Sequence, residues 1–118
     1  MRARKGRVTV GERTYIQSNS NLVAGRKNTI MIGENCKLAH NVTIRALCHD
    51  PYHPDLSIER DVIVGDNFWI GANAFVREGV TVGSDSVIGA YAAVTKNVEY
   101  NIIVGGIPAK LIRRKNTI

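Results

Sequence analysis

A six-residue repeat runs through most of this sequence and constrains its fold more than any other feature. Valine or isoleucine recurs at every sixth position in the second half of the chain, with a small or apolar residue two positions before it. An α-helix would require apolar spacings of three and four. The repeat therefore predicts short strands, whose two sets of inward positions are Val64, Ile70, Val76, Val82, Ile88, Val94 and Val62, Phe68, Ala74, Val80, Ser86, Ala92.

Each repeat is predicted to be one short strand followed by a turn. Residues i and i−2 lie on the same face of an extended segment, and the segments GEN, GDN, GAN and GSDS supply residues typical of turns. No repeat can bury its apolar pair alone, so the repeats must stack into a continuous interior. The same pattern occurs earlier at Ile32, Leu38 and Ile44. We therefore predict an all-β fold, a parallel β-solenoid, in a single domain over residues 1–118.

The repeat is interrupted between Ile44 and Val64, which are twenty residues apart. Prolines and aspartates in this interval predict a loop insertion at about 47–61. An insertion in a solenoid maps to one face, often the binding face. His49 lies at the root of this loop, and an imidazole is the usual group that removes a proton from an alcohol near neutral pH. His49 is therefore a candidate general base, whereas His53 is expected to be a solvated loop side chain.

Composition and charge narrow the possible partners. The 118 residues carry a net charge of +6, which suits nucleic acid, an acidic membrane surface or a phosphorylated small molecule. Aromatic residues make up only 6% and do not alternate with basic ones as in base-stacking surfaces, so we expect no nucleic acid. No apolar run is long enough to span a membrane. The basic start lacks the apolar run of a secretory signal, and the two cysteines form no disulfide framework, so a cytoplasmic location is expected.

Three segments resemble the hexapeptide-repeat acyltransferases, and within them the maltose/galactoside O-acetyltransferase branch. They read IGENCKLAHNVTIRALCHDP, IVGDNFWIGANAFVREGVTVGSDSVIGAYAAVTKNV and VGGIPAKLIRR. The resemblance implies a left-handed parallel β-helix with three sides in each coil. It also implies transfer of an acetyl group from acetyl-CoA to a hydroxyl of a sugar or similar small acceptor, assembly as a homotrimer, and no metal.

The same resemblance suggests roles for individual residues. His49 matches the family's catalytic base. Asn19 matches an acceptor-binding asparagine, and Trp69 matches a tryptophan that borders the acceptor pocket. An oxyanion donor is expected near residues 69–72. The residues expected to bind the cofactor acetyl-CoA are Ala72, Ala90, Thr95, Lys96, Lys110 and Arg113.

Counting sides of the solenoid predicts where Asn19 and His49 lie relative to each other. They are four sides apart, which is one full coil plus one side, if the residues around AGRKN bulge without changing corner. The two residues then occupy different corners of one chain and can meet only across a subunit boundary. This predicts a C3 trimer with active sites between subunits.

The end of the sequence is expected to cover the open end of the solenoid. Pro108 can begin a helix, and Ala109 to Arg114 suit a short one. We therefore predict a C-terminal cap at about 107–118 that contains a short helix. Relatives in the sugar acetyltransferase branch usually begin with a helical segment, whereas this sequence enters its repeats almost at once, so we expect a differently built acceptor side.

Two other functions remain open at this point. Left-handed β-helix trimers include zinc carbonic anhydrases, and His49 and His53 have a plausible ligand spacing. The third histidine of that family would be expected near GERTYIQ, which contains none, and His40 occupies a turn-like, exposed position. The second alternative is a non-catalytic solenoid that serves as a binding or assembly surface. Such a protein would need neither a base nor the residues that match the CoA-binding segments.

Overall fold

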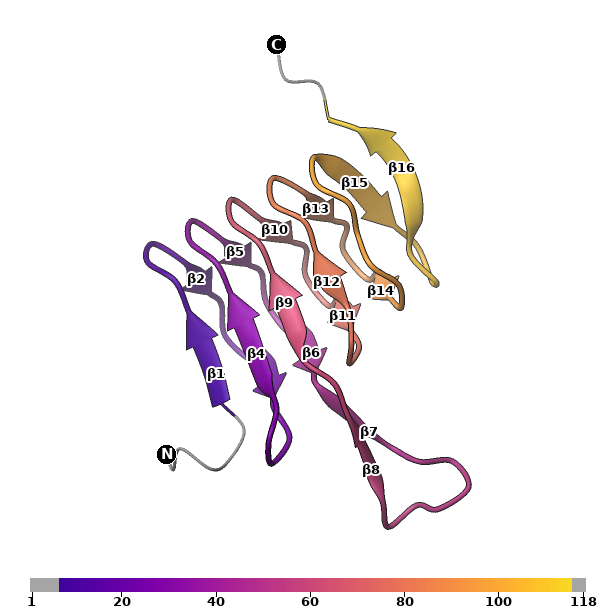
Figure 1. Ribbon diagram of the computed structural model, residues 1–118. Coiled ribbons are helices and arrows are strands. Elements are labelled where there is room, and N and C mark those ends of the chain that lie inside the picture. Colours follow the sequence, from indigo (N-terminus) through magenta and orange to yellow (C-terminus); the bar gives the residue numbers. More distant parts are fainter. Residues whose placement is uncertain (1–6, 116–118) are drawn as a thin grey trace.

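In the computed structural model, which describes residues 7–115, the chain winds into a β-solenoid with three flat faces (Figure 1). The first face contains β1 (Arg7–Val10), β4 (Thr29–Ile32), β9 (Val62–Val64) and β12 (Thr81–Val82). The second face contains β2 (Tyr15–Ile16), β5 (Lys37–Leu38), β10 (Trp69–Ile70), β13 (Val87–Ile88), β15 (Ile102–Gly105) and β16 (Lys110–Arg114). The third face contains β3 (Asn21–Val23), β6 (Thr43–Arg45), β11 (Phe75–Val76) and β14 (Ala93–Val94).

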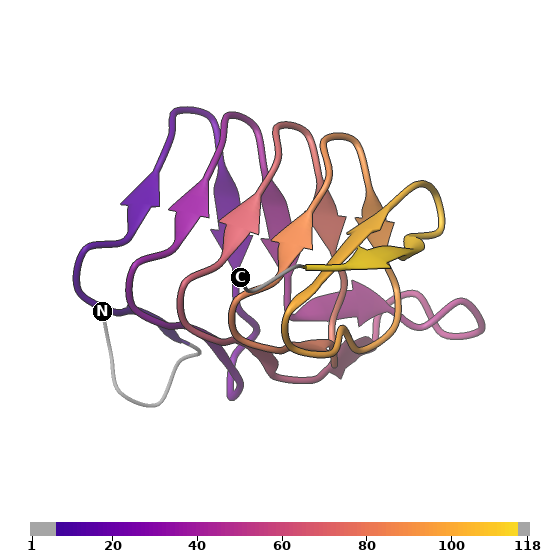
Figure 2. The same cartoon turned by 90° about the horizontal axis from the view of Figure 1, so that it is seen from above.

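Successive strands belong to successive faces, so each coil passes along the first, second and third face before the next coil begins. Figure 2 shows the coils lying next to one another along the solenoid. The pairing between coils is parallel on all three faces, as between Ile30 and Val62 or between Ile70 and Ile88. We name the turns between faces the first–second, second–third and third–first corners.

The interior of the solenoid consists of the residues that the repeat predicts to point inward. Both sets of inward positions in the second half of the chain are buried, including the polar Ser86. The prediction for the earlier coils is also confirmed, since Ile32, Leu38 and Ile44 are at most 4% exposed. The first coil is less covered, because it stands at the end of the stack: Val10 is 43% and Ile16 is 38% exposed.

The corners contain the turn residues that the sequence predicts. Non-glycine residues with positive φ recur at the same place in successive coils, because a tight turn there requires the left-handed conformation that Asn and Asp tolerate. Stacking also explains why glycine stands at position 71: a Cβ there would lie 2.5 Å from the amide nitrogen of Ala90 in the next coil. The positive-φ residues are Arg13, Asn35, Asn67, Asp85 and Asn101 at the first–second corner, and Asn19, Asn41, Asn73 and Tyr91 at the second–third corner.

The interruption in the repeat forms an ordered hairpin. Strands β7 (Leu47–His49) and β8 (Ser57–Glu59) pair antiparallel and project from the third–first corner, away from the stacked coils (Figures 1 and 2). The hairpin ends where Arg60 N donates a hydrogen bond to Ala46 O at 3.0 Å, so the chain leaves and re-enters the solenoid at one point. The region predicted as a loop therefore contains two paired strands, which residues 50–56 connect.

The short C-terminal helix predicted for Ala109 to Arg114 is wrong. These residues form β16, which pairs antiparallel with β15 and covers the end of the solenoid. The physical reason is the free edge of β15: without β16, its outer N–H and C=O groups would have no strand partner. Ala109 packs against the interior, whereas Leu111, opposite Val104, is exposed.

The described residues contain no helix that is long and apolar enough to cross a membrane. The domain predicted for residues 1–118 includes residues 1–6 and 116–118, which lie outside the described part of the chain. The same holds for the last three residues of the predicted C-terminal cap.

Candidate active site

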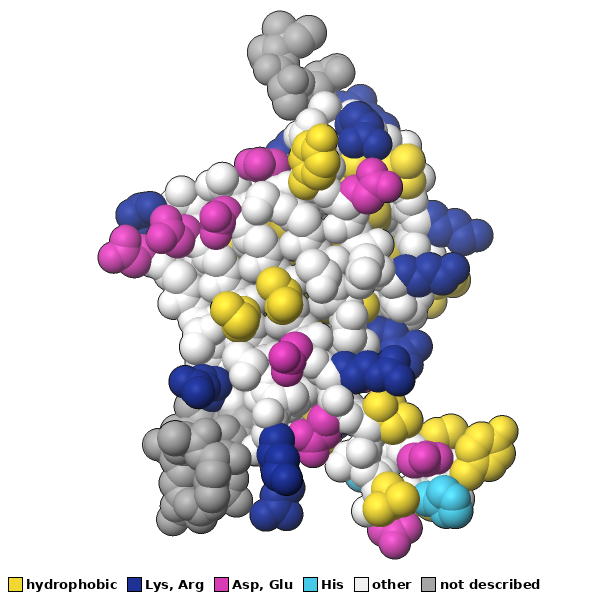
Figure 3. Space-filling view, viewed as in Figure 1, with side chains coloured by type: hydrophobic (Ala, Val, Ile, Leu, Met, Phe, Trp, Pro, Cys, Tyr) yellow, Lys and Arg dark blue, Asp and Glu magenta, His cyan; other side chains and the backbone are white. Residues whose placement is uncertain are grey.

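His49 is the last residue of β7, on the hairpin that projects from the third–first corner. It lies opposite Ser57 of β8, and its side chain is exposed. The turn beyond it is held by Asp50, whose Oδ1 accepts hydrogen bonds from Tyr52 N at 2.8 Å and His53 N at 3.3 Å. Figure 3 shows histidine side chains on this hairpin, with Lys and Arg side chains along the neighbouring edge of the solenoid. A paired strand and a bonded turn therefore support the imidazole of His49.

A buried acidic group lies beneath the same hairpin. The Glu78 carboxylate is 5% exposed and pairs with Arg77, with 2.6 Å between Oε2 and Nη2. Burial would raise the pKa of Glu78, but the hydrogen bond and charge of Arg77 outweigh burial and lower that pKa. The Cys48 thiol, on the strand next to His49, lies close enough to Glu78 for that carboxylate to raise its pKa.

Cys48 is not suited to act as a nucleophile. Burial, followed by the negative charge of Glu78, raises the pKa of the Cys48 thiol above its ordinary value. The thiolate is the reactive form, so this thiol stays protonated and unreactive near neutral pH. Its side chain contacts Glu78 on the side of the strand opposite to His49, as expected for neighbours in an extended segment.

Asn19 lies in the turn between β2 and β3, at the second–third corner, with a φ of 64°. Four strands, β3 to β6, separate it from the hairpin of His49 at the third–first corner. The residues around AGRKN bulge without changing corner, as the counting assumed. This follows because β3 pairs with β6 on the third face and β1 pairs with β4 on the first. Within one chain the two candidate residues therefore stand at different corners.

Trp69 lies on the outer surface of the second face, where it is 56% exposed. It borders a hollow of about 400 Å³. This hollow extends along the second face toward the second–third corner, where Asn19 lies. The lining of the hollow consists of Tyr15, Gln17, Lys37, Leu38, Ala39, His40 and Trp69.

The residues expected to bind acetyl-CoA fall into three places. Ala72 and Ala90 occupy the same position of the second–third corner in neighbouring coils, where Tyr91 N donates to Ala72 O at 2.9 Å. Thr95 and Lys96 follow β14 at the third–first corner, and both are exposed. The remaining two are the exposed Lys110 and Arg113 on β16.

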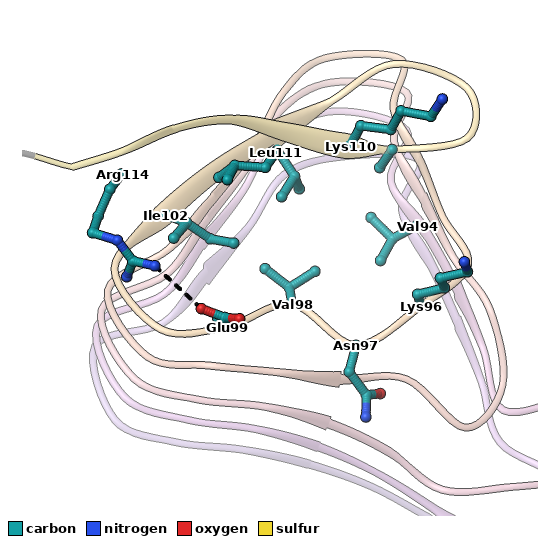
Figure 4. A pocket seen from close by; sticks show the side chains of 11 residues that line it. Val94, Lys96, Asn97, Val98, Glu99, Ile102, Lys110, Leu111 and Arg114 are labelled. Carbon is teal, nitrogen blue, oxygen red and sulfur yellow. Dashed lines mark hydrogen bonds and ion pairs between the residues drawn. The ribbon is translucent and has the colours of Figure 1, made fainter.

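Two of these lysines border the same cavity at the end of the solenoid. Lys96 and Lys110 both line a cavity of about 270 Å³ whose interior wall includes Val94, Val98 and Leu111. In Figure 4 the two ammonium groups lie at the same side of this cavity, while Arg114 points to the other side and pairs with Glu99 at 3.3 Å. Arg113 does not line this cavity and lies opposite Ile103 in the β15–β16 pair.

The remaining histidines lie apart from each other: one is in the hairpin turn and one is at another corner of the solenoid. Within residues 7–115 no group of three or more His, Cys, Asp or Glu side chains is arranged to hold a metal ion. His53 lies in the hairpin turn, where its N–H donates to Asp50 O at 3.2 Å. His40 lies at the second–third corner instead, with its Nδ1 3.1 Å from Ser18 Oγ.

Comparison with known proteins supports the interpretation of the repeat. Residues 61–96 match the family model "Bacterial transferase hexapeptide (six repeats)". The chain is 35% identical to the galactoside O-acetyltransferase of Escherichia coli (strain K12) over 114 residues, which is 92% of this chain and 55% of that protein. This is a hexapeptide-repeat protein related to the galactoside O-acetyltransferases. It spans about half the length of the relatives that it matches.

Solved structures of acetyltransferases have the same fold. The acetyltransferase VCA0836 of Vibrio cholerae, in complex with acetyl-CoA, superposes with a TM-score of 0.86 at 27% identity over 93% of this chain and 61% of that one. The polySia-specific acetyltransferase NeuO superposes with a TM-score of 0.81 at 34% identity over 96% of this chain and 54% of that one. These matches confirm the resemblance to hexapeptide-repeat acyltransferases that the three sequence segments indicate.

Proposed function

We propose that this protein is an acetyl-CoA-dependent O-acetyltransferase with His49 as its general base. The observation that carries the proposal is the position of His49 on a supported hairpin in a chain 35% identical to a galactoside O-acetyltransferase. A related V. cholerae acetyltransferase binds acetyl-CoA, which supports acetyl-CoA as the donor. Relatives that act on galactosides and on polySia support a saccharide as the acceptor.

In the proposed reaction, His49 removes the proton of the acceptor hydroxyl as its oxygen attacks the thioester carbonyl. The tetrahedral intermediate then collapses: the C–S bond breaks, His49 returns its proton to the leaving sulfur, and the acceptor keeps the acetyl group. Asn19 and Trp69 hold the acceptor. The backbone N–H of Ala72 donates no hydrogen bond within the described residues, which makes it our candidate donor to the oxyanion.

Acetyl-CoA is proposed to lie along the corners that carry the matching residues. The small side chains of Ala72 and Ala90 leave room for the pantetheine arm next to the backbone. Thr95 and Lys96 lie at the third–first corner, as His49 does, so in the proposed trimer a neighbouring copy would bring them to this track. Lys96 and Lys110 share one side of the end cavity, where they would attract phosphate groups. Arg113 is proposed to add positive charge near the nucleotide.

We also propose a homotrimer with its active sites between subunits. Asn19 and His49 stand at different corners of one chain, so a neighbouring copy must supply one of them if both contact the same acceptor.

A left-handed coil is part of this proposal. In Figure 1 the chain rises along the first face, passes behind through the second and descends along the third while advancing toward β16, which supports this hand. A cytoplasmic location remains a prediction from the sequence.

The proposal is tested by release of free thiol from acetyl-CoA. Purified protein is incubated with acetyl-CoA alone and with galactose, maltose, glucose or glucuronate, and the products are analysed by mass spectrometry. We expect acceptor-dependent thiol release and one added acetyl group on the sugar. Thiol release that no hydroxyl acceptor stimulates, with no acetylated product, would contradict the proposed function.

A further inference from the structure

The outer surface of the second face carries a cation between two aromatic rings. Tyr15 pairs with Lys37, and Lys37 pairs with Trp69, in adjacent parallel strands. Strands in a sheet are about 4.8 Å apart, so the three side chains form a continuous row. Tyr15 is 63% and Trp69 is 56% exposed, and both therefore offer ring surface to a ligand. A lysine flanked in this way can also contact the aromatic faces directly.

Hollows lie on both sides of this row, and both include Lys37 and Trp69. The first, of about 400 Å³, extends toward the second–third corner, and the second, of about 520 Å³, extends toward the first–second corner. Among residues 7–115, neither lining contains an aspartate or a glutamate, whereas Lys115 adds a second cation to the larger hollow. Lys37 takes part in none of the salt bridges within residues 7–115. Its charge is therefore available to an anionic ligand.

A histidine is fixed at the edge of the first hollow. The Nδ1 atom of His40 lies 3.1 Å from Ser18 Oγ, and its backbone oxygen accepts a hydrogen bond from Asn73 N at 3.0 Å. With Nδ1 bound to Ser18, the Nε2 edge of the ring remains for a ligand. Ser18 immediately precedes Asn19, so this edge connects the hollow to the proposed acceptor site.

We propose that the row Tyr15–Lys37–Trp69 and the first hollow, of about 400 Å³ and bordered by His40, bind a saccharide acceptor that carries a carboxylate. A pyranose ring has an apolar C–H face that packs on an aromatic side chain, here Trp69, and its hydroxyl groups can bond to His40. Lys37 pairs with the carboxylate. One unpaired cation at the centre of the row matches a single negative charge better than a dianionic phosphate. This inference rests on the proposed function, because Asn19 and Trp69 contact the acceptor there.

The test compares two ligands that differ in charge alone. Binding of D-glucuronate and of the neutral D-glucuronamide to the full chain is measured by isothermal titration calorimetry, without acetyl-CoA. We expect the wild-type protein to bind glucuronate about tenfold more tightly, as one charge-assisted contact provides. Lys37→Gln should bring the ratio of the two affinities close to one. Equal affinities for both ligands in the wild-type protein, or an unchanged ratio in Lys37→Gln, would overturn the inference.

A matched control separates this local contact from the overall positive charge. Arg7→Gln removes one positive charge from the exposed side of β1, on the first face, and should keep the wild-type ratio. An equal loss in Arg7→Gln and Lys37→Gln would indicate a nonspecific charge effect and also overturn the inference. Because no acetyl-CoA is present, failure here is distinct from failure of the thiol-release assay with neutral sugars, which concerns the proposed function.

Discussion

His49→Ala lowers kcat for acetyl transfer by about 10²–10⁴-fold, the range that a general base contributes. The acceptor hydroxyl then has no group to remove its proton, while the hairpin and the acetyl-CoA track are unchanged. The measurement is acceptor-dependent thiol release at saturating acetyl-CoA. KM for acetyl-CoA should change little, because the imidazole is proposed to act on the acceptor and not to bind the nucleotide.

His53→Ala is the matched control for this substitution. His53 lies four residues further along the same hairpin, is exposed, and has no role in the proposed reaction. It should therefore keep wild-type kcat within about twofold, since surface substitutions outside special features have small effects. If both variants lose activity equally, the hairpin as a whole matters and His49 is not the base. If His49→Ala keeps its activity, the proposed mechanism is wrong.

Phe68→Ala lowers the free energy of unfolding by about 3–5 kcal/mol, the cost of removing a large aromatic side chain from a core. Phe68 is 2% exposed and is the largest fully buried side chain of the solenoid. Its ring fills the interior at the first–second corner, where the neighbouring coils cannot close the space without losing their register. The measurement is unfolding by urea at a fixed protein concentration, because association would make apparent stability depend on concentration.

Tyr100→Ala controls for the loss of an aromatic side chain as such. Tyr100 lies at the same corner two coils further along the chain, but its side chain is 66% exposed. Its removal should therefore change the free energy of unfolding by less than about 0.5 kcal/mol. Equal destabilisation by the two substitutions would show that the solenoid interior does not dominate stability. It would also contradict the assignment of Phe68 to an inward position of the repeat.

The interior and the corners could be predicted from the sequence because both depend on local rules. Inward positions such as Val64 and Phe68 follow from alternation within a short strand. Asn67 follows from the left-handed backbone of a tight turn. Each rule needs only the six-residue spacing, which the sequence displays directly. The corner positions of Asn19 and His49 follow from the same counting.

The C-terminal strand could not be predicted in this way, since its conformation depends on a partner. Residues 109–114 are acceptable in a helix by local propensity, and only the free edge of β15 favours a strand.

The same limit applies to the row Tyr15–Lys37–Trp69 on the second face. Tyr15 and Lys37 are 22 positions apart and Lys37 and Trp69 are 32 apart, so irregular connections, including the hairpin, decide which residues become neighbours. The sequence alone therefore gave no indication that Lys37 and His40 border the hollow beside Trp69.

Activity in a mixture of two inactive variants tests most directly whether the active site lies between copies of the chain. Asn19→Ala and His49→Ala chains are assayed separately and after co-expression in equal amounts. Each variant alone should be nearly inactive. If the two chains assemble at random, each mixed trimer has one complete site in three, and about a quarter of all sites combine Asn19 of one copy with His49 of its neighbour, so we expect about a quarter of wild-type activity. Activity of the mixture no greater than that of the separate variants would contradict an active site shared between subunits.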